Sequence, residues 1–204
     1  LNEMTNESGK DKFMGSALVR YNVNEHFKIQ VTGGADINFM NFQDYAAPTS
    51  PGFEQGQLQI SDFRNRMYNV EALAIYNNSY KKFDYGVTIG GNLYKVDNKT
   101  QIVTAKEMVM RDVIALQSFT SKEITEGTYR KQINSLYGSI NLAYGNFVYL
   151  DATLRGDHSS TLPSGNNTYL YPSVSGSFLF SEFFKINPTL LPYGKVRVSW
   201  AQVG

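Results

Sequence analysis

The chemically most capable side chains of the sequence stand between residues 151 and 160. Asp157, His158 and Ser159 are the residue types of a serine–histidine–carboxylate triad, in which the histidine accepts the proton of an attacking serine hydroxyl. A working triad needs members that converge from separate elements, and an oxyanion hole beside the serine. Neighbours on a strand point to opposite faces, so His158 and Ser159 would not converge. We therefore expect no catalytic residue in this group and no enzymatic activity.

Other reactive residues also lack the spacing that a known site requires. Asp36, Asp44 and Glu54 do not follow the ligand order of a calcium loop. His26 and His158 stand too far apart in sequence for a short metal motif, and the chain has no cysteine to act as a thiolate ligand. We expect neither a metal site nor a cofactor.

The composition narrows the class of protein. A formal net charge of +1 over 204 residues excludes a whole-chain attraction to nucleic acid. Only 18% of the residues are charged, whereas 14% are aromatic and 17 are glycine. A mean hydropathy of −0.33 excludes a bundle of membrane helices. This balance favours a β-rich protein, and outer-membrane barrels are among the few classes that prefer it.

Hydrophobic alternation with a period of two residues is the strongest pattern in the sequence. Ile29 and Val31 alternate with Gln30 and Thr32, whereas a helix, with its period of 3.6, would mix the two sets. The orientation of residues 66–76 stays open, because both of its faces carry apolar residues. The pattern predicts eight strands, at residues 13–21, 27–39, 66–76, 83–94, 133–144, 147–157, 169–180 and 195–200.

The lengths of these segments and of their connections favour a transmembrane barrel. Several segments run about ten to thirteen residues, close to the roughly nine to eleven of a tilted membrane-spanning strand. Short turns are expected at residues 22–26, 77–82 and 145–146, and long polar connections at 40–65, 96–130 and 158–168. Such alternation is typical of an up-and-down outer-membrane barrel. Within the connections we expect irregular chain over 40–65, a short helix within 104–117 and a helical turn within 181–194.

Aromatic residues gather beside the expected short turns, where rings of barrel proteins meet the lipid headgroups. The residues of this predicted girdle are Tyr21, Phe27, Tyr76, Phe83, Tyr85, Tyr144, Phe147, Phe178 and Phe180. The alternative is a β-sandwich whose rim aromatics cover the edge of one core.

Four features in a fixed order carry a resemblance to a known family. They are YLDATLRGDHSS at 149–160, TLP followed by Asn at 161–167, YPSVS at 171–175, and a Lys-x-Arg-x-Ser strand ending in Val-Gly at 195–204. Together they resemble the mid-barrel region of the SusC/RagA-type TonB-dependent transporters of Bacteroidetes.

The resemblance implies a 22-stranded barrel in the outer membrane, closed by an N-terminal plug, powered through TonB and capped by a SusD-like surface lipoprotein. The implied activity is import of glycan oligomers or peptides. We expect residues 1–204 to supply about eight antiparallel strands of that all-β transmembrane barrel, without the plug domain and the remaining strands. Both ends of the chain look cut, so the expected function belongs to the parent protein.

Two sets of residues are candidates for contact with a transported molecule. Charged residues expected to face the lumen are Asp36, Asp151, Arg155, Asp157, Lys195 and Arg197. The alternative for this set is a structural ladder of ion pairs within the wall. Aromatic residues expected in loops, as contacts for substrate or lid, are Phe42, Tyr45, Phe53 and Phe63. The alternative for them is packing of loops against each other.

Two other functions remain open at this point. A complete eight-stranded barrel would close around a packed interior and serve a structural or adhesive role. A soluble surface β-sandwich that binds carbohydrate would bury Val31, Ile89, Leu150 and Val198 together in one core. In-strand glycines such as Gly33 and Gly90 are expected to permit bending or close approach of the plug.

Overall fold

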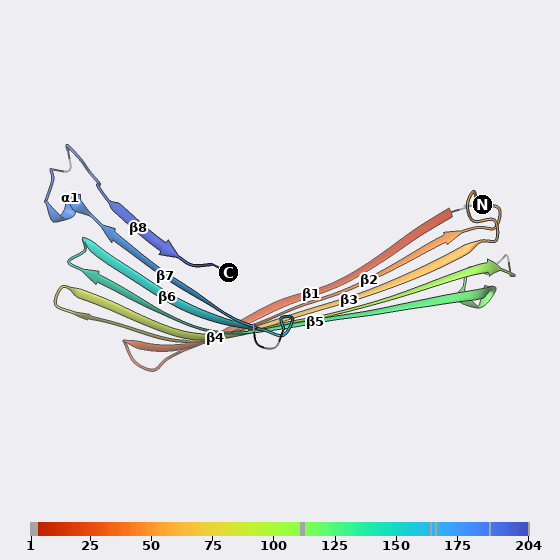
Figure 1. Cartoon of the computed structure of the whole chain (residues 1–204), viewed down its shortest axis with the longest axis horizontal. Helices are drawn as coiled ribbons and strands as arrows, with labels where there is room; N and C mark the ends of the chain where they lie inside the picture. The colour runs from red at the N-terminus through yellow and green to blue at the C-terminus, as the bar shows by residue number, and fades with distance from the viewer. Residues whose placement is uncertain (1–3, 111–112, 164, 166, 188, 204) are drawn as a thin grey trace. The chain divides into compact units, whose positions relative to one another are not determined.

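The fold is a single antiparallel sheet of eight strands in the described residues of a computed structural model (Figure 1). The structure describes residues 4–110, 113–163, 165, 167–187 and 189–203. The strands neighbour one another in chain order and are β1 (Met4–Asn22), β2 (Phe27–Ala46), β3 (Gln57–Tyr80), β4 (Phe83–Met108), β5 (Phe119–Tyr144), β6 (Val148–Ser159), β7 (Thr168–Phe178) and β8 (Val196–Ala201). The described helical turns are η1 (Leu116–Ser118) and α1 (Phe180–Phe183).

None of the helices in the described residues is long and apolar enough to pass through a membrane.

The chain divides into two compact units. Strands β1 to β5 contribute to both, and β6 to β8 belong to the second alone. Unit 1 consists of Leu1–Gly15, Ala35–Tyr68 and Lys95–Lys131, and unit 2 of Ser16–Gly34, Asn69–Tyr94 and Gln132–Gly204.

In unit 2 the strand register keeps apolar residues opposite apolar residues. Leu142 stands opposite Leu150, and Leu154 stands opposite both Gly138 and Pro172. Because side chains alternate between the faces of a strand, the intervening pairs are polar. The apolar face thus carries Val87, Ile89, Leu136, Ile140, Leu150, Leu154, Leu170, Val174 and Val198, and the polar face carries Ser135, Tyr137, Asn141, Asp151, Thr153, Arg155, Asp157, Ser173 and Ser175.

The apolar face of unit 2 is exposed instead of packed into a core. Ile89 is 58% exposed, Leu150 43% and Val198 72%, and Val31 in the same unit is 43% exposed. These four residues are the ones that a β-sandwich would bury together, so the sandwich prediction is wrong. A contiguous exposed apolar surface of this kind marks a site of contact with another protein or with a membrane.

The sheet order also bears on the stand-alone barrel. An eight-stranded barrel that closes on itself would pair β8 with β1. In the described part of the chain, the order runs from β1 to β8, and these two strands stand at its opposite ends. The strands agree with an up-and-down segment of a larger sheet.

In unit 1 the strands run farther than the alternation predicts. The predicted irregular connection at 40–65 is wrong, because β2 continues to Ala46 and β3 begins at Gln57. The predicted connection at 96–130 is likewise replaced over most of its length by β4 and β5. Hydrogen bonds between neighbouring backbones hold these strand extensions in the sheet. The extensions have no alternating apolar face, so hydropathy alone does not predict them as strands.

The helix expected within residues 104–117 is also wrong. Residues 104–108 belong to β4, residues 111–112 lie outside the described part, and only η1 is helical. Ala105 is fully buried and packs with Tyr45, Leu58 and Phe119 in a small core of unit 1. Ala105 and Met108 therefore meet that core from a strand and Leu116 meets it from η1, whereas Val109, at the expected helical spacing, is exposed.

The expected turns at 22–26 and 145–146 are confirmed, whereas the expected turn at 77–82 is shorter, because β3 continues to Tyr80. Asn24 accepts hydrogen bonds from the backbone N–H groups of His26, at 2.9 Å, and Phe27, at 2.8 Å, which closes the β1–β2 turn. Gly145 and Asn146 both have positive φ, as the two central residues of a type I′ turn do, and the N–H of Phe147 donates to the carbonyl of Tyr144 at 3.2 Å. The helical turn expected within 181–194 is confirmed as α1, although it begins one residue earlier. Phe180 therefore starts a helix and does not end the predicted strand.

Candidate polar wall site

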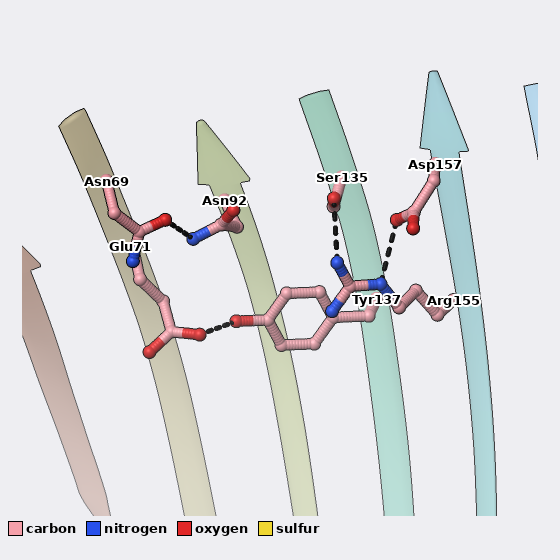
Figure 2. A network of polar contacts seen from close by, with 7 residues as sticks. All are labelled: Asn69, Glu71, Asn92, Ser135, Tyr137, Arg155 and Asp157. Carbon is pink, nitrogen blue, oxygen red and sulfur yellow. Dashed lines mark hydrogen bonds and ion pairs between the residues drawn. The ribbon is translucent and has the colours of Figure 1, made fainter. Parts of the chain in front are cut away.

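The centre of the candidate site is the guanidinium group of Arg155 on the polar face (Figure 2). Its Nε lies 2.7 Å from Asp157 Oδ1, and a terminal nitrogen donates to the hydroxyl of Ser135 at 3.0 Å. Arg155 and Asp157 share a face because they are two residues apart on β6. Ser135 joins them because the register places it opposite Asp157 on β5. Both charges are partly exposed, so the pair remains accessible to water.

The side chain of Tyr137, on β5, extends this site to β3, which is not a neighbour of β5 in the sheet. The guanidinium carbon of Arg155 lies 5.5 Å from the centroid of the Tyr137 ring. The hydroxyl of Tyr137 donates a hydrogen bond to Glu71 on β3, past the intervening strand β4 (Figure 2). A cation, an aromatic ring and two carboxylates thus form one connected group across β3, β5 and β6.

Gly90 provides the room for this crossing. A Cβ atom at Gly90 would lie 2.6 Å from the Tyr137 ring and 2.6 Å from Cδ2 of Leu73. Any larger residue would therefore displace the ring from its path to Glu71. This close approach of a side chain gives Gly90 a local role that the sequence prediction of bending or plug contact does not contain.

The same contacts settle the orientation of residues 66–76. Glu71 and Leu73 lie on the polar face, since both approach Tyr137 or Gly90. Asn69, two residues before Glu71, accepts a hydrogen bond of 2.8 Å from Asn92 on β4. Val70 lines the apolar side instead. Glu71 therefore presents its carboxylate on the polar face, although the sequence pattern of residues 66–76 left the orientation of this strand open.

A second polar group lies on the same face around Asp151. The side-chain amide of Asn141 donates to Asp151 at 2.6 Å, and the hydroxyl of Ser175 donates to it at 3.4 Å. Thr153 and Ser173 are hydrogen-bonded at 2.6 Å between β6 and β7. The polar face is thus a hydrogen-bonded surface of hydroxyl, amide and carboxylate groups.

The six charged residues predicted to face the lumen have different contacts in the structure. Arg155 and Asp157 form an ion pair, and Asp151 lies on the same face with its own partners. Lys195 lies 5.6 Å from the centroid of the Tyr149 ring, and Arg197 stands opposite Ser177. Asp36 belongs to unit 1, where its carboxylate lies 3.1 Å from Lys12. These contacts favour the ion-pair alternative for Arg155 and Asp157, while direct contact with a transported molecule stays a prediction.

The aromatic residues predicted for loops have different surroundings from those expected. Phe42, Tyr45 and Phe63 lie in strands, and only Phe53 lies in the connection over 47–56. Phe42 and Phe63 pack edge to face, with ring centroids 5.9 Å apart. Tyr45 is buried in the unit 1 core, where its hydroxyl lies 3.5 Å from Met108 Sδ. These rings therefore pack within the protein, and Phe53 keeps a position in a connection.

The residues that resemble a triad do not assemble into one. Nδ1 of His158 lies 3.1 Å from the hydroxyl of Thr168, and the Ser159 hydroxyl lies 3.0 Å from that of Thr161. Each of these groups is engaged with a threonine, and His158 does not orient the serine. Sequence reasoning singled out this group and overlooked Tyr137 and Glu71. The sequence signal that could have revealed them is Gly90, a glycine within a predicted strand, together with Tyr137, an aromatic residue on the polar face of the next strand.

Comparison with known proteins places this geometry in context. No family model matches the sequence. The chain is 23% identical over 211 residues to TonB-dependent receptor P26 of Formosa agariphila (strain DSM 15362 / KCTC 12365 / LMG 23005 / KMM 3901 / M-2Alg 35-1), covering 98% of this chain and 21% of the receptor. The chain therefore spans about a fifth of the length of this curated relative.

Solved structures show the same fold. The RagAB peptide transporter matches with a TM-score of 0.88 at 15% identity, covering 98% of this chain and 23% of that chain. The RagAB peptide importer in its closed-closed state matches with a TM-score of 0.85 at 16% identity and the same coverage. Sequence and fold together confirm the predicted resemblance to a barrel segment of the SusC/RagA type.

Proposed function

We propose that this chain forms part of the barrel wall of a TonB-dependent importer in the outer membrane. The observation that carries the proposal is the two-faced sheet of unit 2, in which exposed apolar residues alternate with a hydrogen-bonded polar face. An importer wall needs this arrangement, because one face meets lipid and the other meets an aqueous interior. The similarity to a TonB-dependent receptor and to RagAB supports the import activity.

The cargo in this proposal is a nutrient oligomer, either a peptide or a glycan. The hydroxyl, amide and paired charged groups of the polar face can form hydrogen bonds with a peptide or with a glycan, whatever the net charge of that molecule. The proposed partners are a SusD-like surface lipoprotein that acts as a lid, and TonB, which acts through parts of the parent protein outside this chain. Membrane lipid surrounds the apolar face.

Named residues have proposed roles on the interior side of the wall. Asp151 and the Arg155–Asp157 pair line the interior, where water and cargo can compete for their hydrogen bonds. Lys195, Arg197 and Asp36 complete the charged set. Among the aromatic residues, Phe53 is the proposed contact for cargo or lid, and Phe42 and Phe63, whose rings pack together, are proposed secondary contacts.

The test is an uptake assay in cells that carry the complete gene. Cells receive a fluorescent oligopeptide or a fluorescent oligosaccharide, and accumulation is compared among the wild type, a deletion of this gene and a deletion of the TonB gene. We expect both deletions to abolish accumulation of one oligomer class, while a monomeric nutrient that diffuses through porins still enters. Accumulation of both oligomers that is independent of TonB would contradict coupled import.

The lid partner is tested separately by purification. The tagged protein, solubilised in a mild detergent, is expected to carry a SusD-like lipoprotein through gel filtration. Migration of the protein without any such lipoprotein would contradict this part of the proposal and leave the uptake result unaffected.

A further inference from the structure

Aromatic rings form a continuous row at one end of the strands of unit 2. The ring centroid of Phe83 on β4 lies 4.6 Å from that of Tyr144 on β5, and Tyr144 lies 5.5 Å from Phe147. Phe147 in turn lies 6.5 Å from Phe178 on β7. Phe178 stands opposite Val196, so it belongs to the apolar face. The predicted clustering of rings beside the short turns is therefore confirmed for these four residues, and the row is continuous with the apolar face.

The helical turn α1 and the residue that follows it, Phe184, add two rings to this row. The centroid of Phe183 lies 5.0 Å from Phe147 and 5.4 Å from Phe178. The centroid of Phe184 lies 5.0 Å from Phe183 and 6.5 Å from Phe178. Phe184 nevertheless remains 65% exposed. The aromatic row thus continues beyond the last strand residue into the connection between β7 and β8, which we call the anchor loop (residues 180–194).

The anchor loop is held closed at its base. The backbone N–H of Gly194 donates to the hydroxyl of Ser181 at 2.9 Å, and the N–H of Ser181 donates to the carbonyl of Gly194 at 3.4 Å. A Cβ atom at Gly194 would lie 2.4 Å from the Phe180 ring, so only glycine permits this contact. The N–H of Ile186 donates to the Ser181 carbonyl at 3.0 Å. These contacts fix the position from which Phe183 and Phe184 project.

The rest of the loop also presents apolar side chains to its surroundings. Leu190 is 85% exposed, on a turn in which its N–H donates to the carbonyl of Asn187 at 2.9 Å. Tyr193 is also exposed. Lys185, directly after Phe184, supplies a cation among these apolar groups. Exposed rings, a leucine and a lysine on one loop are the residue types that settle at a membrane–water interface.

We propose that the anchor loop inserts into the interface of a phospholipid leaflet. Phe183, Phe184 and Leu190 enter the boundary between headgroups and acyl chains, and Lys185 faces the lipid phosphates. The bilayer is the occupant because the rings of the loop contact rings of the lipid-facing apolar face, with no break between them. This inference rests on the membrane position of the sheet and goes beyond import. The loop then fixes the depth of β7 and β8 in the membrane.

The experiment measures the depth of a fluorescent probe in a bilayer. The chain has no cysteine, so Phe184→Cys and Leu190→Cys each provide a single labelling site within it. The complete protein is labelled with a nitrobenzoxadiazole (NBD) probe and reconstituted into phosphatidylcholine liposomes that contain lipid nitroxides, placed either at the headgroup or deep in the acyl chain. Matched controls are Leu154→Cys on the apolar face and Thr153→Cys on the polar face.

We expect the probes at 184 and 190 to lose most of their emission to the headgroup nitroxide and little to the deep nitroxide. The probe at 154 should be quenched by lipid nitroxides, and the probe at 153 should not. Quenching at 154 without quenching at 184 and 190 would overturn the anchor and leave the membrane position of the sheet intact. Absence of quenching at all four positions would overturn both. Shielding of 184 from aqueous iodide without lipid quenching would identify a protein cover and also overturn the anchor.

Discussion

The hydroxyl of Tyr137 on β5 donates a hydrogen bond to the carboxylate of Glu71 on β3, so that one side chain joins two strands that are not neighbours. The ring crosses β4 at Gly90, which is buried beneath it. On its other side, the ring lies beneath the guanidinium group of Arg155. A brace of this kind ties strands β3 to β6 together on the face that we propose lines the interior.

Replacing Gly90 with alanine should destabilise the protein. The added Cβ would lie 2.6 Å from the Tyr137 ring and 2.6 Å from Leu73, so both side chains must move. We expect a loss of about 1–3 kcal/mol in the free energy of unfolding, measured by urea titration in liposomes. The matched control is Gly91→Ala, where the nearest atom is the Ser135 carbonyl oxygen at 3.5 Å. Equal effects of the two substitutions would contradict the role of Gly90.

Removing the hydroxyl of Tyr137 should leave the Glu71 carboxylate without this donor. We expect Tyr137→Phe to lower the free energy of unfolding by about 1–2 kcal/mol. A double-mutant cycle with Glu71→Gln isolates the shared interaction. Additive effects of the two substitutions would show that the hydrogen bond does not form in the membrane-embedded protein.

The ion pair between Arg155 and Asp157 should contribute little to stability by itself. Both side chains are partly exposed, so we expect Asp157→Asn to cost less than about 1 kcal/mol. Arg155→Ala should cost more, because it also removes the contacts to Ser135 and Tyr137. The measurement is the same urea titration in liposomes. A larger loss for Asp157→Asn than for Arg155→Ala would reverse this order and contradict the account.

Substituting Gly194 should loosen the anchor loop. A Cβ atom there would lie 2.4 Å from the Phe180 ring, so Gly194→Ala must open the base of the loop. We expect faster proteolytic cleavage between residues 180 and 194 in liposomes. Gly176→Ala is the control, since its nearest neighbour is a backbone oxygen at 4.0 Å. Unchanged cleavage in the Gly194 variant would show that the base contacts do not hold the loop.

The sequence predicts the strands of unit 2 well because an apolar face and a polar face impose a period of two. Residues 83–94, 133–144 and 147–157 show that period clearly, and they lie within β4, β5 and β6 apart from Phe147. The extensions of the strands in unit 1 carry polar residues on both faces. Hydropathy therefore gives no period there, and only backbone pairing identifies them as strands.

The candidate site is predictable only in part. The face shared by Asp151, Arg155 and Asp157 follows from their even spacing on one strand. The link between Tyr137 and Glu71 depends on the register of three strands and on the space above Gly90. No local pattern contains that information, since 66 residues separate the two partners in sequence.

The central claim is that the two faces of β6 meet different solvents, and spin labelling tests it most directly. A nitroxide is placed in turn at residues 150 to 154 of the protein in liposomes, and its collisions with oxygen, which concentrates in lipid, and with a nickel chelate, which stays in water, are measured. We predict that labels at Leu150, Ala152 and Leu154 collide mainly with oxygen, and labels at Asp151 and Thr153 mainly with the chelate. Equal access of the chelate to all five positions would contradict the account.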